Sequence, residues 1–312
     1  MQALAGTLVV DFTRYLPGAF ASRELQRLGA RVVRAEQPGG DPMRLTSPEW
    51  YDTLNAGKES VVVELPAEVD FARALLERAD VILESFRPGV ADRLGIGPDA
   101  APARAVYCSL TGFGLGGEHE QRAGHDLNYV GWAGLLEDTA PALPPVQAAD
   151  LAAGALGAVT EVLAALLERE HTGRGARVVV SMTHGAQRLA PRSPVLTRGF
   201  ACYSMYACAD GRYLTVAALE PKFFERLCTL AERPDLAGRQ YDAEQTDLRN
   251  ALGDVFASRP LEHWLRLFES EDVCVGPVAT RAEAAAAFGA PASGHAAATG
   301  EHTASWRRAV EH

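Results

Sequence analysis

The chain has 312 residues, of which 47% are hydrophobic and 22% charged, and its formal net charge is −10. This length is enough for one large domain or two smaller ones with a full apolar core. The acidic balance, without any Lys/Arg-rich run, argues against a nucleic-acid surface.

The first 110 residues alternate between strand and helix patterns. Short β-branched runs predict strands over 7–12, 30–35, 60–65, 81–84 and 105–110, and apolar residues at helical spacing predict helices over 18–29, 68–78 and 90–94. This alternation predicts an α/β fold with a doubly wound, mainly parallel, Rossmann-like sheet. Ligands of such sheets bind beyond the carboxyl ends of the strands.

The remaining elements predict a second domain and a tail. Helices are expected over 126–136 and 150–168 and a strand over 177–181; strands over 213–217 and 273–277, with helices over 222–233, 245–258 and 261–270, then form a smaller α+β domain. We therefore assign 1–185 to a large domain and 200–280 to a small one. Residues 281–312 are rich in Ala, Gly and His with few large apolar residues, which predicts a weakly structured tail.

The sequence also favours a cytoplasmic protein. The longest apolar stretch, 151–167, is broken by Thr160 and Glu161 and is expected to be too short and polar for a membrane span, so no membrane partner is expected. The N-terminus has no basic region typical of a signal peptide. Five cysteines without a CxxC pair indicate a reduced compartment and no metal site.

A histidine and two acids stand out in the middle of the chain. His125 and Asp126 begin one predicted helix, and Asp150 follows 24 residues after Asp126 at the start of an Ala/Gly-rich helix. Such a set offers a proton acceptor and a proton donor for one substrate carbon. Taken singly, each has an ordinary structural role that is more common: Asp150 as a helix N-cap, and His125 as a hydrogen-bonded histidine at a helix start.

Basic residues follow the predicted strands and helices of the large domain. The candidates for binding a phosphate-bearing ligand are Arg34, Arg44, Lys58, Arg87 and Arg93. Arg87 is placed best, because it lies in a turn directly after the strand over 81–84. Any one of these side chains alone is more often solvated or ion-paired at a surface.

Segments spread along the chain resemble the class III CoA-transferase and α-methylacyl-CoA racemase family. They keep the family order from residue 4 to about residue 278, and they comprise 4–12, 28–34, 38–44, 54–60, 79–90, 93–97, 109–114, 121–129, 172–175 and 210–223. The resemblance implies a CoA thioester substrate, no permanently bound cofactor, and a homodimer with interlocked subunits. It also implies that Arg87 and Arg93 hold CoA.

The resemblance assigns catalytic roles as well. In racemases of the family, the positions of His125 and Asp150 exchange the α-proton from opposite faces, and Asp126 orients the region around them. Glu220 matches a family acid that supports the histidine from the small domain, although before Pro221 it is also typical of an ordinary helix start. Backbone N–H groups at the start of the helix after Asp150 are expected to hold the enolate oxygen.

Two other functions fit the same residues. CoA transferases of the family use the aspartate at the position of Asp150 as a nucleophile, forming a mixed anhydride, and the loop over 38–44 resembles their form. His125 favours the racemase, since transferases commonly carry another residue there. A non-catalytic CoA-binding subunit is the third possibility, because the chain is shorter than usual over 181–206 and after about residue 278.

Overall fold

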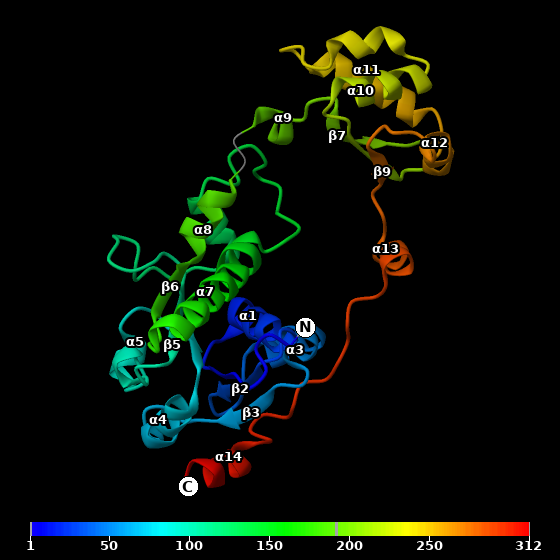
Figure 1. Cartoon of the computed structure of the whole chain (residues 1–312). Coiled ribbons are helices and arrows are strands. Elements are labelled where there is room, and N and C mark those ends of the chain that lie inside the picture. Colours follow the sequence, from blue (N-terminus) through cyan, green and yellow to red (C-terminus); the bar gives the residue numbers. More distant parts are fainter. Residues whose placement is uncertain (1, 191–192, 312) are drawn as a thin grey trace. The chain divides into compact units, whose positions relative to one another are not determined.

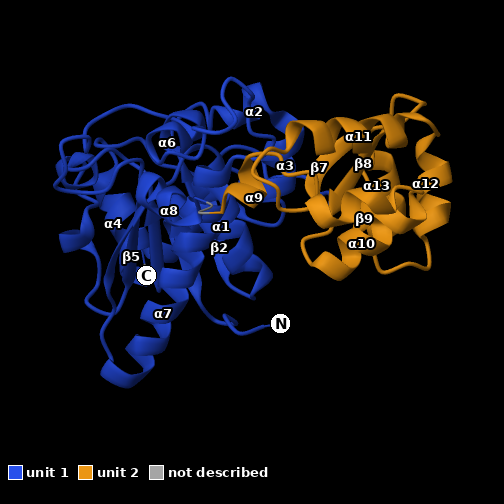
Figure 2. Cartoon of the chain, turned by 90° about the horizontal axis from the view of Figure 1, so that it is seen from above, with its two compact units in different colours: residues 1–190, 292–312 blue, residues 191–291 orange. Residues whose placement is uncertain are grey.

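The computed structural model describes residues 2–190 and 193–311, which divide into two compact units. Unit 1 contains residues 1–190 and 292–312, and unit 2 contains residues 191–291 (Figure 2). The small unit is thus inserted into the large one, because the chain returns to unit 1 after leaving unit 2. Each unit has its own apolar core.

A six-stranded parallel sheet forms the centre of unit 1, in the order β3-β2-β1-β4-β5-β6 (Figure 1). Its strands are β1 (Leu8–Asp11), β2 (Arg31–Glu36), β3 (Glu59–Val62), β4 (Val81–Glu84), β5 (Val106–Thr111) and β6 (Arg177–Ser181). This confirms the predicted α/β fold. The strand order reverses between β1 and β4, which is where doubly wound sheets bind ligands.

Helices cover both faces of this sheet. Unit 1 contains α1 (Tyr15–Arg27), α2 (Met43–Thr46), α3 (Pro48–Asn55), α4 (Val69–Arg78), α5 (Val90–Arg93), η1 (Pro98–Ala100), α6 (Asp126–Trp132), η2 (Ala148–Leu156), α7 (Gly157–Thr172), α8 (Met182–Leu189) and α14 (Thr303–Val310). Consecutive strand residues point to opposite faces, so Val9 packs with residues of α1 and α7 while Val10 packs with those of α4 and α14. Both faces are therefore buried, and the strands read as continuous apolar runs.

The helix predicted over 150–168 has a different form and length. It begins as the π-helix η2 and continues as the α-helix α7, giving 25 helical residues from 148 to 172. Small residues permit close packing here: a Cβ on Gly154 would lie 2.8 Å from Met182, and one on Gly185 would lie 2.8 Å from Ala153 of η2. By length and composition alone this helix is able to cross a membrane, contrary to the expectation above, but half of its apolar window is buried in unit 1, as in a core helix.

Unit 2 has a three-stranded antiparallel sheet, β7-β8-β9, packed against helices. Its elements are α9 (Pro194–Thr197), β7 (Tyr203–Ala207), β8 (Tyr213–Ala217), α10 (Pro221–Leu230), η3 (Pro234–Arg239), α11 (Thr246–Ala257), α12 (Leu261–Phe268), β9 (Val275–Pro277) and α13 (Arg281–Phe288). Phe224, Leu248 and Phe256 are fully buried in its core. This matches the predicted class of a small α+β unit, with β7 and α13 not anticipated.

The C-terminal segment is folded from residue 296 onward, which differs from the weakly structured tail expected over 281–312, whereas residues 289–295 have no regular structure. Residues 296–306 run along β3: Ala296 bridges Ala56, His302 N–H donates to the Ser60 carbonyl at 2.9 Å, and Trp306 Nε1 donates to Glu59 at 2.7 Å. Trp306 is buried, and it is the one large apolar residue of α14. One well-placed tryptophan anchors a segment whose average composition is weakly apolar. His312 lies outside the described residues.

Candidate functional site

Two cavities lie beyond the carboxyl ends of β1, β2, β4 and β5. One, of about 500 Å³, is called the Glu36 cavity and includes Thr13, Glu36, Asp41, Leu65 and Phe86 in its wall. The other, of about 470 Å³, is called the His125 cavity. Arg14, Phe86 and Val90 line both, so the two cavities are neighbours at the point where the strand order reverses.

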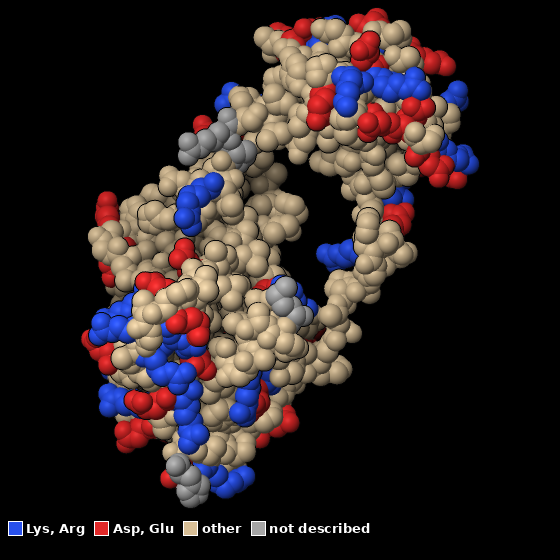
Figure 3. Space-filling view, in the orientation of Figure 1, with Lys and Arg blue, Asp and Glu red and all other residues tan. Residues whose placement is uncertain are grey.

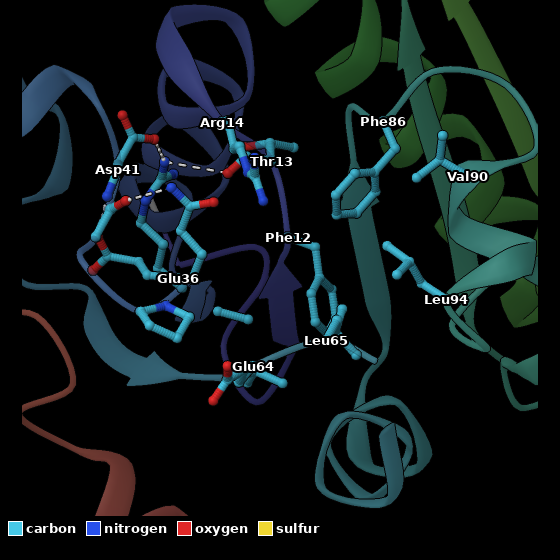
Figure 4. A pocket seen from close by; sticks show the side chains of 16 residues that line it. Phe12, Thr13, Arg14, Glu36, Asp41, Glu64, Leu65, Phe86, Val90 and Leu94 are labelled. Atoms are coloured by element: carbon cyan, nitrogen blue, oxygen red, sulfur yellow. Dashed lines mark hydrogen bonds and ion pairs between the residues drawn. The ribbon is translucent and has the colours of Figure 1, made fainter. Parts of the chain in front are cut away.

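The Glu36 cavity has an apolar side and a charged side. Figure 4 shows Phe12, Leu65, Phe86 and Leu94 grouped together, facing the region of Glu36 and Asp41. Apolar walls with a few fixed polar groups are typical of small-molecule sites. The division suits a ligand that has both an apolar and a polar part.

The structure brings His125 and Asp150 into one cavity. His125 is the N-cap of α6 and is exposed, and its backbone N–H donates to Asn128 Oδ1 at 3.1 Å. Asp150 is buried, 9% exposed, and lines the same cavity from η2. Asp126, on the first turn of α6, accepts the Asp150 N–H at 2.8 Å. Asp126 therefore ties the two helix starts together and positions Asp150 directly.

The environment of Asp150 suits proton transfer near neutral pH. Burial, followed by the nearby negative charge of Asp126, raises the pKa of Asp150 to about 7. A carboxyl group that titrates there is able to donate and accept a proton under ordinary conditions. Asp150 occupies the third position of the π-helix rather than an N-cap, so the ordinary structural explanation for this residue does not apply. Short π-helical segments are frequent at functional sites.

The sequence predicted that backbone N–H groups at the helix start after Asp150 hold the enolate oxygen, and this prediction does not fit the geometry. The Asp150 N–H donates to Asp126, and the Leu151 N–H donates to the Gln147 carbonyl at 2.9 Å. These two amides are therefore occupied and are not free to hold an oxyanion. The sequence could not show this, because it depended on α6 and η2 meeting side by side.

The five predicted CoA-binding side chains separate into two groups. Arg87 and Arg93 are exposed, and Arg87 lines the His125 cavity from the turn after β4. Glu84, which is buried at the end of β4, accepts the Phe86 N–H at 2.7 Å and fixes this turn. Arg87 therefore lies where a ligand in the His125 cavity would meet it, whereas Arg93 lines neither cavity and its contact with CoA stays a prediction.

Arg44 and Lys58 line neither of these two cavities, and Arg34, which lines the Glu36 cavity, is held in ion pairs. Arg34 is 2% exposed and is ion-paired with Asp11, at 3.0 Å, and with Asp41. Lys58 is 3% exposed, and its ammonium donates to Ala19, Ser22 and Asn55 at 2.8 to 2.9 Å. Arg44 forms a two-point pair with Glu36 and donates to the Ala297 carbonyl at 2.9 Å.

The protein itself engages these three side chains, for a physical reason. A buried cation needs compensating acceptors, and here the acceptors come from the protein itself. The charged groups form a network beneath the turn between β1 and α1, in which Arg34, Arg44 and Lys58 support the site; their contact with a CoA phosphate stays a prediction.

Several lining residues were missed from the sequence. Arg14 and Arg122 bring basic groups to the His125 cavity, and Tyr15 and Tyr129 bring aromatic ones. Arg14 follows β1 as Arg87 follows β4, so the rule that selected Arg87 also applied to Arg14. No sequence signal marks Tyr15, whose role depends on its backbone conformation.

Glu220 belongs to unit 2. It is exposed at the N-cap of α10, before Pro221 at the first helical position. Its support of His125 from the small unit stays a prediction.

Charge on the surface is mixed. On the face shown in Figure 3, acidic and basic side chains of unit 1 are interspersed rather than separated into patches. The His125 cavity differs from the chain as a whole, since Arg14, Arg87 and Arg122 in its wall outnumber Glu120 and Asp150. A local excess of positive charge in an acidic protein favours an anionic ligand.

Comparisons with known proteins agree on one family. The family model for CoA-transferase family III matches residues 4–306. Human alpha-methylacyl-CoA racemase is 34% identical over 308 residues, covering 89% of this chain and 78% of its own. A probable fatty acyl-CoA transferase of Mycobacterium tuberculosis is 33% identical, covering 86% and 80%, and mouse succinyl-CoA:glutarate CoA-transferase is 31% identical, covering 89% and 72%.

Solved structures support the same conclusion. The crystal structure of a hypothetical protein from Mycobacterium tuberculosis has a TM-score of 0.83 at 30% identity, covering 98% of this chain and 99% of that one. A CAIB/BAIF family protein from Brucella suis has a TM-score of 0.82 at 25% identity, with the same coverage. Racemases and CoA transferases both occur among the relatives, and their substrates are CoA thioesters. The chain belongs to CoA-transferase family III.

Proposed function

We propose that this enzyme is a 2-methylacyl-CoA racemase that exchanges the α-proton between His125 and Asp150. The observation that carries the proposal is the presence of both side chains in one cavity. A thioester α-proton is acidic only through its enolate, so the reaction needs a base on one face and an acid on the other. Both groups belong to unit 1, and neither depends on the placement of unit 2.

The titration of Asp150 favours proton exchange over nucleophilic attack. A nucleophilic carboxylate has to be ionised, whereas burial beside Asp126 raises the pKa of Asp150 to about 7 and keeps much of it protonated at neutral pH. A protonated Asp150 is able to return a proton to the enolate. The same environment therefore supports the acid half of a two-face exchange.

The adjoining cavities provide room for an elongated CoA ester. We place the thioester and acyl chain in the His125 cavity and the polar remainder of CoA along the Glu36 cavity, past Arg14, Phe86 and Val90. Arg14 lines both cavities and supplies charge for the phosphates, Arg87 and Arg122 add positive charge along the His125 cavity, and Arg93 is available nearby on α5. CoA enters as part of the substrate.

A transferase is the second candidate, because relatives named as CoA transferases match the chain nearly as well as the racemases. In that reaction the Asp150 carboxylate attacks the thioester to give a mixed anhydride and free CoA; the CoA thiolate then displaces the first acid, and CoA is passed to a second acid. A second carboxylic acid is then required. The racemase has no such requirement.

Isotope exchange distinguishes the two candidates. The purified protein is incubated in D₂O with one enantiomer of a 2-methylacyl-CoA, with and without an acceptor acid, and deuterium at the α-carbon and chirality are followed. Exchange with loss of chirality and no acceptor supports the racemase, and His125→Ala is expected to abolish racemisation. Transfer of CoA to the acceptor acid, without exchange at the α-carbon, supports the transferase. CoA binding with neither activity supports a non-catalytic subunit.

We also propose that the protein works as a cytoplasmic homodimer, as the family resemblance implies. The five cysteines are free thiols, which suits a reducing compartment. Light scattering of the full chain tests the dimer, since a monomer mass at micromolar concentration contradicts it. Fractionation of the source cells tests the location.

A further inference from the structure

Tyr15 has a backbone conformation that side chains other than glycine rarely adopt. Its φ is +64°, at the first residue of α1 and in the wall of the His125 cavity. A bulky residue with positive φ is a strained outlier, and such residues gather at functional sites. Residue 15 is a tyrosine rather than a glycine, so the protein holds a large side chain in a strained backbone conformation.

Side-chain acceptors hold this turn in place. Three successive backbone N–H groups donate to them: Thr13 to Asp11 at 2.8 Å, Arg14 to Ser85 at 3.1 Å, and Tyr15 to Asp41 at 3.1 Å. Asp11 and Asp41 are themselves buried and paired with Arg34. These three hydrogen bonds therefore hold the backbone at Tyr15 in its strained conformation.

The conformation directs the Tyr15 ring toward His125. The two rings meet edge to face, with centroids 5.7 Å apart and an interplanar angle of 84°. The Tyr15 side chain is 43% exposed, so burial of its own surface does not explain the strain. His125 is also exposed, and a flexible imidazole would transfer protons poorly because the reacting atoms must be aligned.

We propose that Tyr15 is a positioning residue that orients the imidazole of His125 for proton transfer. This inference rests on the proposed racemase function and goes beyond it, because it names the residue that orients one of the two proton-transferring groups. The ring, rather than the hydroxyl, makes the contact. Tyr15 therefore acts on the His125 side of the reaction and leaves the Asp150 side unaffected.

The test compares deuterium exchange for the two enantiomers. His125→Ala first identifies which enantiomer His125 deprotonates, because exchange of that enantiomer is lost while the other still exchanges at Asp150. Tyr15→Ala is expected to lower kcat for the His125 enantiomer about 10- to 100-fold, with KM changed little. The other enantiomer is expected to stay within about twofold of wild type. Tyr15→Phe keeps the ring and is expected to restore most of the activity.

A matched pair of glycine substitutions separates strain from positioning. Glu232, in unit 2, is exposed and has a φ of +58°. Glu232→Gly and Tyr15→Gly both relieve a positive φ, so both are expected to keep or raise thermal stability. Only Tyr15→Gly is expected to lose exchange at the His125 face. Equal losses for both enantiomers, or full activity in Tyr15→Ala, would overturn the proposal.

A second readout does not depend on the reaction. The imidazole resonance of His125 is assigned in the free protein by its disappearance in His125→Ala, and its fast motion is measured by NMR relaxation. Tyr15→Ala is expected to increase this motion, and an unchanged ring overturns the positioning role. If wild type shows no exchange with either enantiomer, the proposed function fails, while relaxation still decides whether Tyr15 orders His125.

Discussion

Replacing Asp150 with asparagine is expected to stabilise the protein at alkaline pH while abolishing proton exchange. The rise in the pKa of Asp150 from 3.8 to about 7 corresponds to roughly 4 kcal/mol of destabilisation once the group is ionised in the folded protein. Because the folded-state pKa is raised, stability is fully present below about pH 4 and is lost as the pH rises toward 7. The asparagine amide would be buried without hydrogen-bond partners, which costs about 1 to 3 kcal/mol and offsets part of the stability gained by removing the charge.

The assay is urea unfolding of wild type and Asp150→Asn at fixed protein concentration, at pH 5 and at pH 8. The cost of the amide is the same at both pH values, so it cancels in the comparison. The stability difference between variant and wild type is expected to increase by about 2.5 kcal/mol from pH 5 to pH 8. Asp70→Asn, on the exposed side of α4, serves as the control and is expected to show little change. A difference independent of pH would refute the argument that burial and Asp126 disfavour the charged form of Asp150.

Three further outcomes are expected. Asp126→Asn removes a like charge and lowers the pKa of Asp150, so the limb of the kcat/KM pH profile that reports Asp150 moves to lower pH. A limb that stays at the same pH contradicts this. Arg87→Ala weakens CoA binding about tenfold in calorimetry and reduces its salt dependence; unchanged affinity at low salt removes Arg87 from the site. Trp306→Ala costs about 3 to 5 kcal/mol in thermal unfolding, because it empties a buried position and removes the indole hydrogen bond to Glu59, which keeps only its pair with Arg31; a loss below 1 kcal/mol means that the C-terminal segment is not anchored there.

The sheet of unit 1 could be predicted because its strands are local patterns. Short β-branched runs separated by helical spacing specify a parallel sheet whatever surrounds them, and the strands over 81–84 and 177–181 have the predicted bounds. The sequence did not reveal that residues 148–156 form a π-helix rather than an α-helix. The π-helix depends on tertiary packing against Met182 and on the hydrogen bond from Asp150 to Asp126.

The candidate site was predictable in part for the same reason. His125, Asp126 and Asp150 carry chemistry that is visible in their identity and order, and Arg87 follows a strand. The burial of Arg34 and Lys58 was not visible, because a basic residue at a strand end has the same appearance whether it faces solvent or a buried acid. Tyr15 was missed because backbone strain depends on Asp11 and Asp41, which its neighbours in sequence do not reveal.

The C-terminal segment has a consequence for synthesis of the chain. The edge strand β3 is complete once residue 62 has been made, but its partners His302, Thr303 and Trp306 lie about 240 positions later. Throughout translation of unit 2, this parallel edge keeps unpaired backbone groups, which are a template for pairing with other chains. Unit 2 ends at residue 291. A ribosome that stops between residues 291 and 303 therefore releases a protein that contains every candidate catalytic residue but leaves the edge of β3 uncovered. Such truncated products are expected to associate through β3 and to depend on chaperones. Residues 302–306 therefore protect this edge only late in synthesis.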